Sequence, residues 1–339
     1  MDAELASICS NETWELTTLP TGHKAIGLKW VFKVKKDPAG QLLLALAAHR
    51  GWQVHHMDVK LAFLNGDLKE EVYVHQPPGY IVSGEEHKVL RLRKALYGLH
   101  QAPRAWYAKL DASLTSLGFE RSPLEHVEFK RSTGKKTLLV GVYVNDLIIT
   151  GTDANDIAAF KQQMHSVFAM SDLGLLGYYL VVEVKQEAGA ITICQSAYAR
   201  KILEAAGLKE CNPCHTPMEN RLKLRKGEAG DVVDATSYRS IVGSLRYLCN
   251  TRADITHAVG MVSRYMQAPT VSHWAAVRQI LRYIMGTIGY GCRYKESSGS
   301  DPKLVGFSDS DLAGDVYDRK STVGVKTGGS RVGGPELCV

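Results

Sequence analysis

Apolar, β-branched runs separated by short polar breaks recur along the first half of the chain, and residues 138–151 are the clearest case. Two apolar runs, Leu138–Tyr143 and Leu147–Thr150, flank the polar pair Asn145 and Asp146. Runs of this composition favour strands, and Asn and Asp tolerate the backbone of a two-residue turn. The pattern predicts a β-hairpin with Asn145-Asp146 at its tip, which lifts the Asp146 carboxylate out of an apolar sheet. An ordinary solvated turn is the alternative.

The same reading predicts the remaining elements. Period-two or β-rich stretches predict strands at residues 28–35, 53–58, 72–75, 88–94, 178–184, 191–194, 290–294 and 304–311. Apolar residues three and four positions apart predict helices at residues 41–50, 62–66, 103–117, 157–168, 197–206, 238–248, 255–266 and 274–285. Residues 1–22 are interpreted as an irregular lead-in, residues 211–235 as a linker, and the glycine-rich end from Lys326 as a tail without a period.

Composition adds a mild basic excess. The chain has 339 residues, 45% of them hydrophobic, and a net charge of +6. These values are typical of a globular protein and permit a nucleic-acid partner without demanding one. Lysines between residues 24 and 36 and the basic strand at 88–94 could contact phosphates, or could be solvated edges. No apolar run is as long as a membrane span, which needs about 20 residues, and the acidic N-terminal sequence lacks a secretory signal. A cytoplasmic location or an intracellular particle is therefore expected.

Two further sequence features suggest metal chemistry. Asp58 ends a predicted strand just where the chain turns away, a position that suits a metal ligand but also a helix cap. The sequence Cys211-Asn-Pro-Cys214-His215 matches half of a zinc site, but no second Cys/His pair lies at ligand spacing, so a structural loop is favoured. Seven scattered cysteines indicate free thiols in a reducing compartment.

Eight short motifs occur together in one order along the chain. They are Trp30-Val-Phe-Lys, Met57-Asp-Val-Lys followed by Ala62-Phe-Leu-Asn-Gly66, Lys94-Ala-Leu-Tyr-Gly-Leu, Gln101-Ala-Pro-Arg-Ala-Trp106, Tyr143-Val-Asn-Asp146, Ser171-Asp-Leu-Gly174, Tyr238-Arg-Ser-Ile-Val-Gly-Ser-Leu, and Ser308-Asp-Ser-Asp-Leu-Ala-Gly-Asp315. In this order and spacing, from about residue 13 to about residue 325, they resemble the reverse transcriptase of copia-type LTR retrotransposons.

The resemblance implies an α+β fold of the right-hand polymerase type, with palm and fingers built from an antiparallel sheet and packed helices. Residues 1–210 would form the fingers and palm, with an internal deletion near residue 41. Residues 211–236 would be a linker and residues 237–300 a helical thumb or connection. Residues 301–339 would be a truncated ribonuclease H-like start with a divergent tail.

The resemblance also assigns a site. In that family palm aspartates hold two Mg²⁺ ions for nucleotidyl transfer from a deoxynucleoside triphosphate onto an RNA/DNA template–primer. Asp58 and Asp146 match metal-binding aspartates, and the backbone carbonyl of Val59 matches a further ligand. The segment with Gln101, Pro103 and Arg104, together with Tyr143, matches the substrate-binding part, and Asp309 matches the first metal-binding aspartate of ribonuclease H.

Three departures from the family pattern predict a defective enzyme. Asn145 stands where the family has a metal-binding aspartate, and loss of a ligand charge should weaken Mg²⁺ binding. The chain runs from Gln41 directly into an apolar helix, where the family has more finger strands and the basic residues that grip the triphosphate. The ribonuclease H part lacks its later carboxylates. Lesser departures are His100, where arginine is usual, and Val181, where glycine is usual.

Three hypotheses follow from these observations. The chain is a reverse transcriptase by descent that has lost catalysis, or a non-enzymatic nucleic-acid-binding remnant, or the barely folded product of a decayed reading frame.

Overall fold

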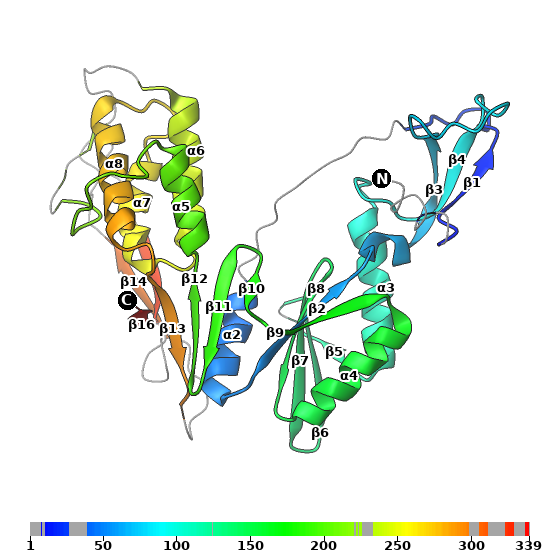
Figure 1. Ribbon diagram of the computed structural model, residues 1–339, viewed down its shortest axis with the longest axis horizontal. Helices are drawn as coiled ribbons and strands as arrows, with labels where there is room; N and C mark the ends of the chain where they lie inside the picture. The colour runs from blue at the N-terminus through cyan, green and yellow to red at the C-terminus, as the bar shows by residue number, and fades with distance from the viewer. Residues whose placement is uncertain are drawn as a thin grey trace. The chain divides into compact units, whose positions relative to one another are not determined.

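A computed structural model describes residues 8, 11–26, 39–123, 125–219, 222, 224–225 and 233–297, and the backbone of residues 305–310, 323–328 and 336–338. The fold is a mixture of helices and antiparallel sheets, as the α+β prediction requires (Figure 1). Two compact units divide the chain. The first contains residues 1–40 and 54–175, and the second contains residues 41–53 and 176–339. The functional domain boundaries proposed from the sequence stay a prediction.

The first unit contains two antiparallel sheets. The three-stranded sheet has the order β1 (Trp14–Thr17), β4 (Val89–Lys94), β3 (Asp67–His75). The six-stranded sheet has the order β5 (Glu120–Arg121), β6 (Glu128–Thr133), β7 (Lys136–Tyr143), β8 (Asp146–Gly151), β2 (Val54–Val59), β9 (Met170–Leu175). The short helix η1 (Ala62–Asn65) connects β2 to β3. β1 lies in the stretch that the sequence predicted to be an irregular lead-in, and the predicted strand at 28–35 lies outside the described residues.

Two helices, α3 (Ala102–Ser116) and α4 (Ala154–Val167), pack on one face of the six-stranded sheet (Figure 1). Alternate residues of each strand face them, because successive side chains of a strand point to opposite faces. Val140 and Val142 of β7 and Met57 of β2 are buried in this core together with Trp106 and Phe160 of the two helices. The opposite face of the sheet carries the intervening residues of β2, β7 and β8, among them Asp58, Tyr143 and Asp146.

The basic strand β4 is largely neutralised within its own sheet. Arg91 Nη2 lies 2.9 Å from Glu71 Oε1, and Arg91 also pairs with Glu15 at 3.6 Å. Arg93 pairs with the same Glu15. The arginines that the sequence offered as phosphate contacts therefore already have carboxylate partners on neighbouring strands.

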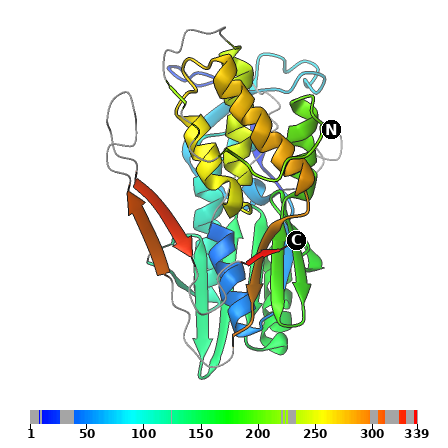
Figure 2. The ribbon, with the colours of Figure 1, turned by 90° about the vertical axis from the view of Figure 1, so that its left-hand side faces the viewer.

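The second unit has helices and small sheets. Its helices are α2 (Ala39–Arg50), α5 (Ser196–Ala205), α6 (Ala235–Leu248), η2 (Ala253–Ile255), α7 (Thr256–Ser263) and α8 (Val271–Gly286). One antiparallel sheet has the order β10 (Tyr178–Tyr179), β11 (Val182–Glu187), β12 (Ala190–Cys194), β13 (Gly291–Lys295), β16 (Glu336–Cys338). β14 (Val305–Ser310) and β15 (Val323–Gly328) form a separate two-stranded ribbon (Figure 2).

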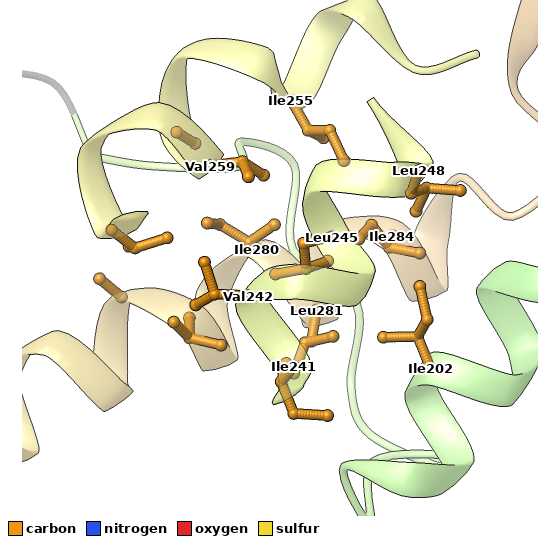
Figure 3. Close-up of a cluster of buried hydrophobic side chains, with 14 of the residues drawn as sticks. Ile202, Ile241, Val242, Leu245, Leu248, Ile255, Val259, Ile280, Leu281 and Ile284 are labelled. Carbon is orange, nitrogen blue, oxygen red and sulfur yellow. The ribbon is translucent and has the colours of Figure 1, made fainter. Parts of the chain in front are cut away.

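The amphipathic faces of α5 to α8 meet in one apolar cluster (Figure 3). Leu245 and Val242 of α6, Ile280 and Leu281 of α8 and Ile202 of α5 point toward one another there, and each is at most 3% exposed. Burial of each such side chain stabilises the folded state by about 1.5–3 kcal/mol. The helices predicted from the three-and-four spacing at 197–206, 238–248, 255–266 and 274–285 are therefore confirmed.

The structure corrects the sequence prediction at two places in this unit. The strand expected at 178–184 is broken by a two-residue turn at Leu180 and Val181 into β10 and β11. The end of the chain, predicted to have no period, contains β15 and β16. A strand can form there because backbone hydrogen bonds to a neighbouring strand do not require an apolar period.

No helix in the described part of the chain is long and apolar enough to cross a membrane.

Candidate functional site

The turn between β7 and β8 differs from the sequence prediction by one residue. Its two residues are Val144 and Asn145, while Asp146 is the first residue of β8 and pairs with Tyr143 across the hairpin. Val144 has a φ of 55°, the left-handed region that β-branched residues rarely adopt. The prediction of Asn145-Asp146 as the tip was wrong, because local preference put the polar pair in the turn.

Contacts from distant parts of the first unit hold this turn in place. The indole Nε1 of Trp106, on α3, donates a hydrogen bond to the carbonyl of Val144. The backbone N–H of Val59, at the end of β2, donates to the carbonyl of Asn145 at 2.8 Å. A strained backbone persists where surrounding structure fixes it, and such strain clusters at functional sites. Trp106 is 2% exposed, and the helical spacing that predicts residues 103–117 gave no sign of its hydrogen bond.

The pairing of β2 with β8 places Asp58 directly opposite Asp146. The same face carries His56, two residues before Asp58, and its Nε2 lies 2.9 Å from Asp146 Oδ1. Because a carboxylate only accepts hydrogen bonds, the His56 ring is the donor. The side chain of His56 is 11% exposed and that of Asp146 is 22% exposed. Sequence reasoning missed His56, although the period-two alternation of a strand puts residues 56 and 58 on one face.

The Asn145 side chain completes the cluster. Its Nδ2 donates a hydrogen bond to Asp58 Oδ1. The opposite orientation of the amide would bring two acceptor oxygens together, so the NH₂ group faces the carboxylate. Asp58, Asn145, Asp146 and His56 thus form one polar cluster at the end of the hairpin.

A cavity of about 310 Å³ lies beside this cluster. Asp58, Asn145 and Lys60 give it polar groups, and Phe63 and Tyr97 line its apolar part. The rings of Phe63 and Tyr97 lie 5.4 Å apart, centroid to centroid, in a tilted arrangement.

Three other predicted site residues lie at the start of α3. Gln101 precedes the first residue of α3, Pro103 stands in its first turn, and Arg104 is exposed there. These three are not among the described residues that line the cavity, whereas Val59 is. The structure therefore brings Asp58, Val59, Tyr143, Asn145 and Asp146 together but does not place the α3 residues in the same cavity.

Asp309 lies in the second unit. It is a residue of β14, opposite Gly324 of β15. Its assignment as a ribonuclease H remnant stays a prediction.

Behind the candidate site, on the helix-covered face of β2, lies a second charged group. Lys161 Nζ, on α4, is 2.9 Å from both carboxylate oxygens of Asp172 and 3.1 Å from His55 Nδ1. Burial, and then the Lys161 charge, lower the pKa of His55 below its ordinary value. Burial acts to raise the pKa of Asp172, but hydrogen bonds from Lys161 and from the N–H of Gly174 outweigh it and lower the pKa.

The Cys211/Cys214 segment lies in the second unit, and its assignment as a structural loop stays a prediction. The Sγ of Cys214 lies 3.3 Å from the carbonyl oxygens of both Thr216 and Gln279, and its single proton can be donated to one of them at a time. No group of three or more His, Cys, Asp or Glu side chains that could hold a metal occurs among the described residues.

Comparison with known proteins identifies the family. The model for the family described as "Reverse transcriptase (RNA-dependent DNA polymerase)" matches residues 38–220. The retrovirus-related Pol polyprotein from transposon TNT 1-94 of Nicotiana tabacum is 37% identical over 369 residues, which cover 96% of this chain and 28% of the tobacco protein. This chain belongs to the reverse transcriptase family of copia-type LTR retrotransposons.

Two other relatives are similar to this chain at more than 30% identity. The retrovirus-related Pol polyprotein from transposon RE1 of Arabidopsis thaliana is 34% identical over 360 residues, covering 96% of this chain and 24% of that protein. The putative transposon Ty5-1 protein of Saccharomyces cerevisiae is 32% identical over 270 residues, covering 79% of this chain and 87% of the yeast protein. The chain spans about a quarter of the length of the tobacco and Arabidopsis polyproteins.

Reverse transcriptases generally use divalent metal ions, so the donor set can be tested against them. Hard cations such as Mg²⁺ prefer carboxylate oxygens. This cluster offers only Asp58 and Asp146, and each already accepts a hydrogen bond from a neighbouring side chain. Asn145 contributes a neutral amide whose donor side faces Asp58. The residues present do not fit a two-metal centre.

Proposed function

We propose that this chain is the polymerase part of a copia-type reverse transcriptase that has lost nucleotidyl transfer. The observation that carries the proposal is the Asn145 side chain, which donates to Asp58 at the position where the family resemblance expects a third carboxylate. A neutral donor there removes negative charge from the place where a divalent cation would need it. Fingers and palm, with Gln101, Pro103 and Arg104 as nucleotide-binding residues, remain part of this proposal.

A deletion in the fingers is a second support for the proposal. The alignment with the tobacco polyprotein runs over 369 positions but covers 96% of the 339 residues, about 325 of them, so about 44 aligned positions fall on gaps in this chain. The family model begins to match only at residue 38, and α2 begins at Ala39. Both agree with a stretch missing near residue 41, where the family has basic residues that grip the incoming triphosphate.

Primer extension tests the proposal. The purified chain is incubated with poly(rA) and an oligo(dT) primer in Mg²⁺ or in Mn²⁺, next to an active reverse transcriptase. We expect no incorporation, and we expect that Asn145→Asp does not restore it, because the missing finger stretch is not repaired. Robust incorporation by the unaltered chain would overturn the proposal. Incorporation by Asn145→Asp alone would assign the whole defect to residue 145.

Nucleic-acid binding without catalysis is the second candidate. Lys60 and Arg104 are exposed in the same unit as the hairpin, and both could contact a template–primer backbone. Filter binding to an RNA/DNA duplex across a salt series tests it. Arg91 and Arg93 already pair with carboxylates. We therefore expect the logarithm of the binding constant to fall only slowly with the logarithm of the salt concentration, with a slope that corresponds to about two or three phosphate contacts. A slope of zero would exclude this candidate.

The third possibility, a decayed and barely folded product, is separated by limited proteolysis. A resistant fragment that contains residues 54–175 would reject it.

A further inference from the structure

The direct pairing of Asp58 with Asp146 needs an explanation. The two carboxylates stand opposite each other on neighbouring antiparallel strands, on the same face of the sheet. Like charges directly opposite destabilise a sheet, and two carboxylates that share a partly buried site repel each other. In a polymerase of this family a divalent cation would offset this repulsion. In this chain some other group must do so.

Two side-chain donors meet this need, one for each carboxylate. The Asn145 amide donates to Asp58 Oδ1, and the His56 ring donates to Asp146 Oδ1 at 2.9 Å. Hydrogen bonds to charged acceptors are about twice as strong as those between neutral groups.

The backbone fixes both donors. His56 is two residues from Asp58 on the same strand, so the alternation of β2 points it at the pair. Asn145 is held by its own carbonyl, which accepts from the Val59 N–H at 2.8 Å. Its neighbour Val144 is held by the Trp106 indole. The amide and the ring are therefore positioned before any ligand arrives.

We propose that the Asn145 amide and the His56 ring replace divalent cations as the partners of the Asp58–Asp146 pair, so that this hairpin is stable without a metal ion. The inference rests on the proposed function for the expectation that a cation would otherwise hold these carboxylates. It follows that Asn145→Asp, which removes one donor and adds a third carboxylate, makes the fold of the hairpin depend on a divalent cation.

Hydrogen exchange of the full chain tests this inference locally. Peptides that cover residues 54–60 and 138–151 are followed by mass spectrometry in EDTA and in 10 mM Mg²⁺ or Mn²⁺. The ionic strength is kept equal, so that the screening of charges is the same in every solution. For the unaltered chain we expect the same protection in all three solutions. For Asn145→Asp we expect about tenfold faster exchange in EDTA, since the partly buried Asp58 carboxylate loses its donor, and recovery when Mn²⁺ is added.

Three variants make the result specific. Asn155→Asp adds the same charge at an exposed position on α4 and should show no dependence on the cation. His56→Gln keeps a donor and should behave as the unaltered chain, whereas His56→Leu removes it and should lose protection in EDTA. If Asn145→Asp does not fold, the two His56 variants still decide.

The outcomes separate this inference from the proposed function. Cation-dependent protection in the unaltered chain, or equal behaviour of His56→Leu and His56→Gln, would overturn the replacement of cations by donors. Incorporation of nucleotide in the primer-extension assay would overturn the proposed loss of catalysis. The hydrogen-exchange result would still decide whether the two donors replace the cations.

Discussion

Val181 adopts a backbone conformation that suits glycine, and the family resemblance expects glycine at this position. Its φ is 139°, and Leu180 before it has a φ of 56°. A non-glycine residue in such a region costs about 1–3 kcal/mol. We expect Val181→Gly to raise the free energy of unfolding by about 1 kcal/mol, less than the full strain because glycine also gains freedom in the unfolded chain. Urea unfolding measures it.

The matched control is Val182→Gly, one residue later. Val182 is the first residue of β11 and pairs with Tyr179 in regular strand geometry. Glycine there should lower stability by about 0.5–1 kcal/mol. Two variants that change stability in the same direction would contradict the strain at Val181.

His55 makes the first unit sensitive to mild acid. Burial and Lys161 lower its pKa in the folded protein below the ordinary value of 6.5. The unfolded chain therefore binds more protons than the folded chain below about that pH, and protonation favours unfolding. The stability that neutral His55 contributes is present above about pH 6.5 and is lost as the pH falls toward the lowered pKa.

We expect His55→Gln to flatten the dependence of stability on pH below about pH 6.5. Denaturant unfolding at a series of pH values measures it. His75→Gln, at the exposed end of β3, is the control and should keep the slope of the unaltered chain. Asp172 acts in the same sense, but at lower pH. Because its folded pKa is lowered, the stability that it contributes is lost as the pH falls below its ordinary value of 3.8.

At the scale of secondary-structure elements, the sequence predicted which helices and strands exist better than it predicted the residues at which they begin and end. The apolar, β-branched run Leu138–Tyr143 predicted β7, and the spacing of Trp106, Leu110 and Leu114 predicted α3. Both patterns reflect the burial of apolar side chains, which the sequence records directly.

What the sequence could not predict depends on contacts between distant residues. The turn falls on Val144 because the Trp106 indole and the Val59 N–H hold the two turn carbonyls, and no local rule selects a β-branched residue there. The hydrogen bond of Asn145 to Asp58 likewise requires the register of β2 with β8.

Trp106→Phe tests whether α3 holds the turn. The substitution keeps an aromatic ring against Phe168, whose centroid lies 5.2 Å away, but removes the donor to the Val144 carbonyl. We expect a loss of about 2–3 kcal/mol, because the carbonyl loses its partner and the smaller ring leaves a void. The rate of hydrogen exchange of residues 138–151 should increase in the same variant. Trp274→Phe in α8 removes the same ring volume in the second unit and should leave that exchange unchanged.

At the scale of the whole molecule, the two compact units can be followed by separate probes. The five cysteines with described side chains all lie in the second unit: Cys194, Cys211, Cys214, Cys249 and Cys292. Burial raises the pKa of the Cys249 and Cys292 thiols to about 11. Since the thiolate is the reactive form, their thiolate fraction at pH 8 is about a hundredfold below that of an ordinary thiol.

We expect iodoacetamide at pH 8 to label Cys211 and Cys214 quickly, and Cys249 and Cys292 only as the second unit unfolds. In a urea series, labelling of the buried pair should therefore report the second unit, while exchange of residues 138–151 reports the first. Trp106→Phe should shift the exchange transition to lower urea and leave the labelling transition unchanged, because it weakens contacts inside the first unit only. A common shift of both transitions would mean that the two units unfold as one cooperative body, and stability changes at the hairpin would then apply to the helical cluster as well.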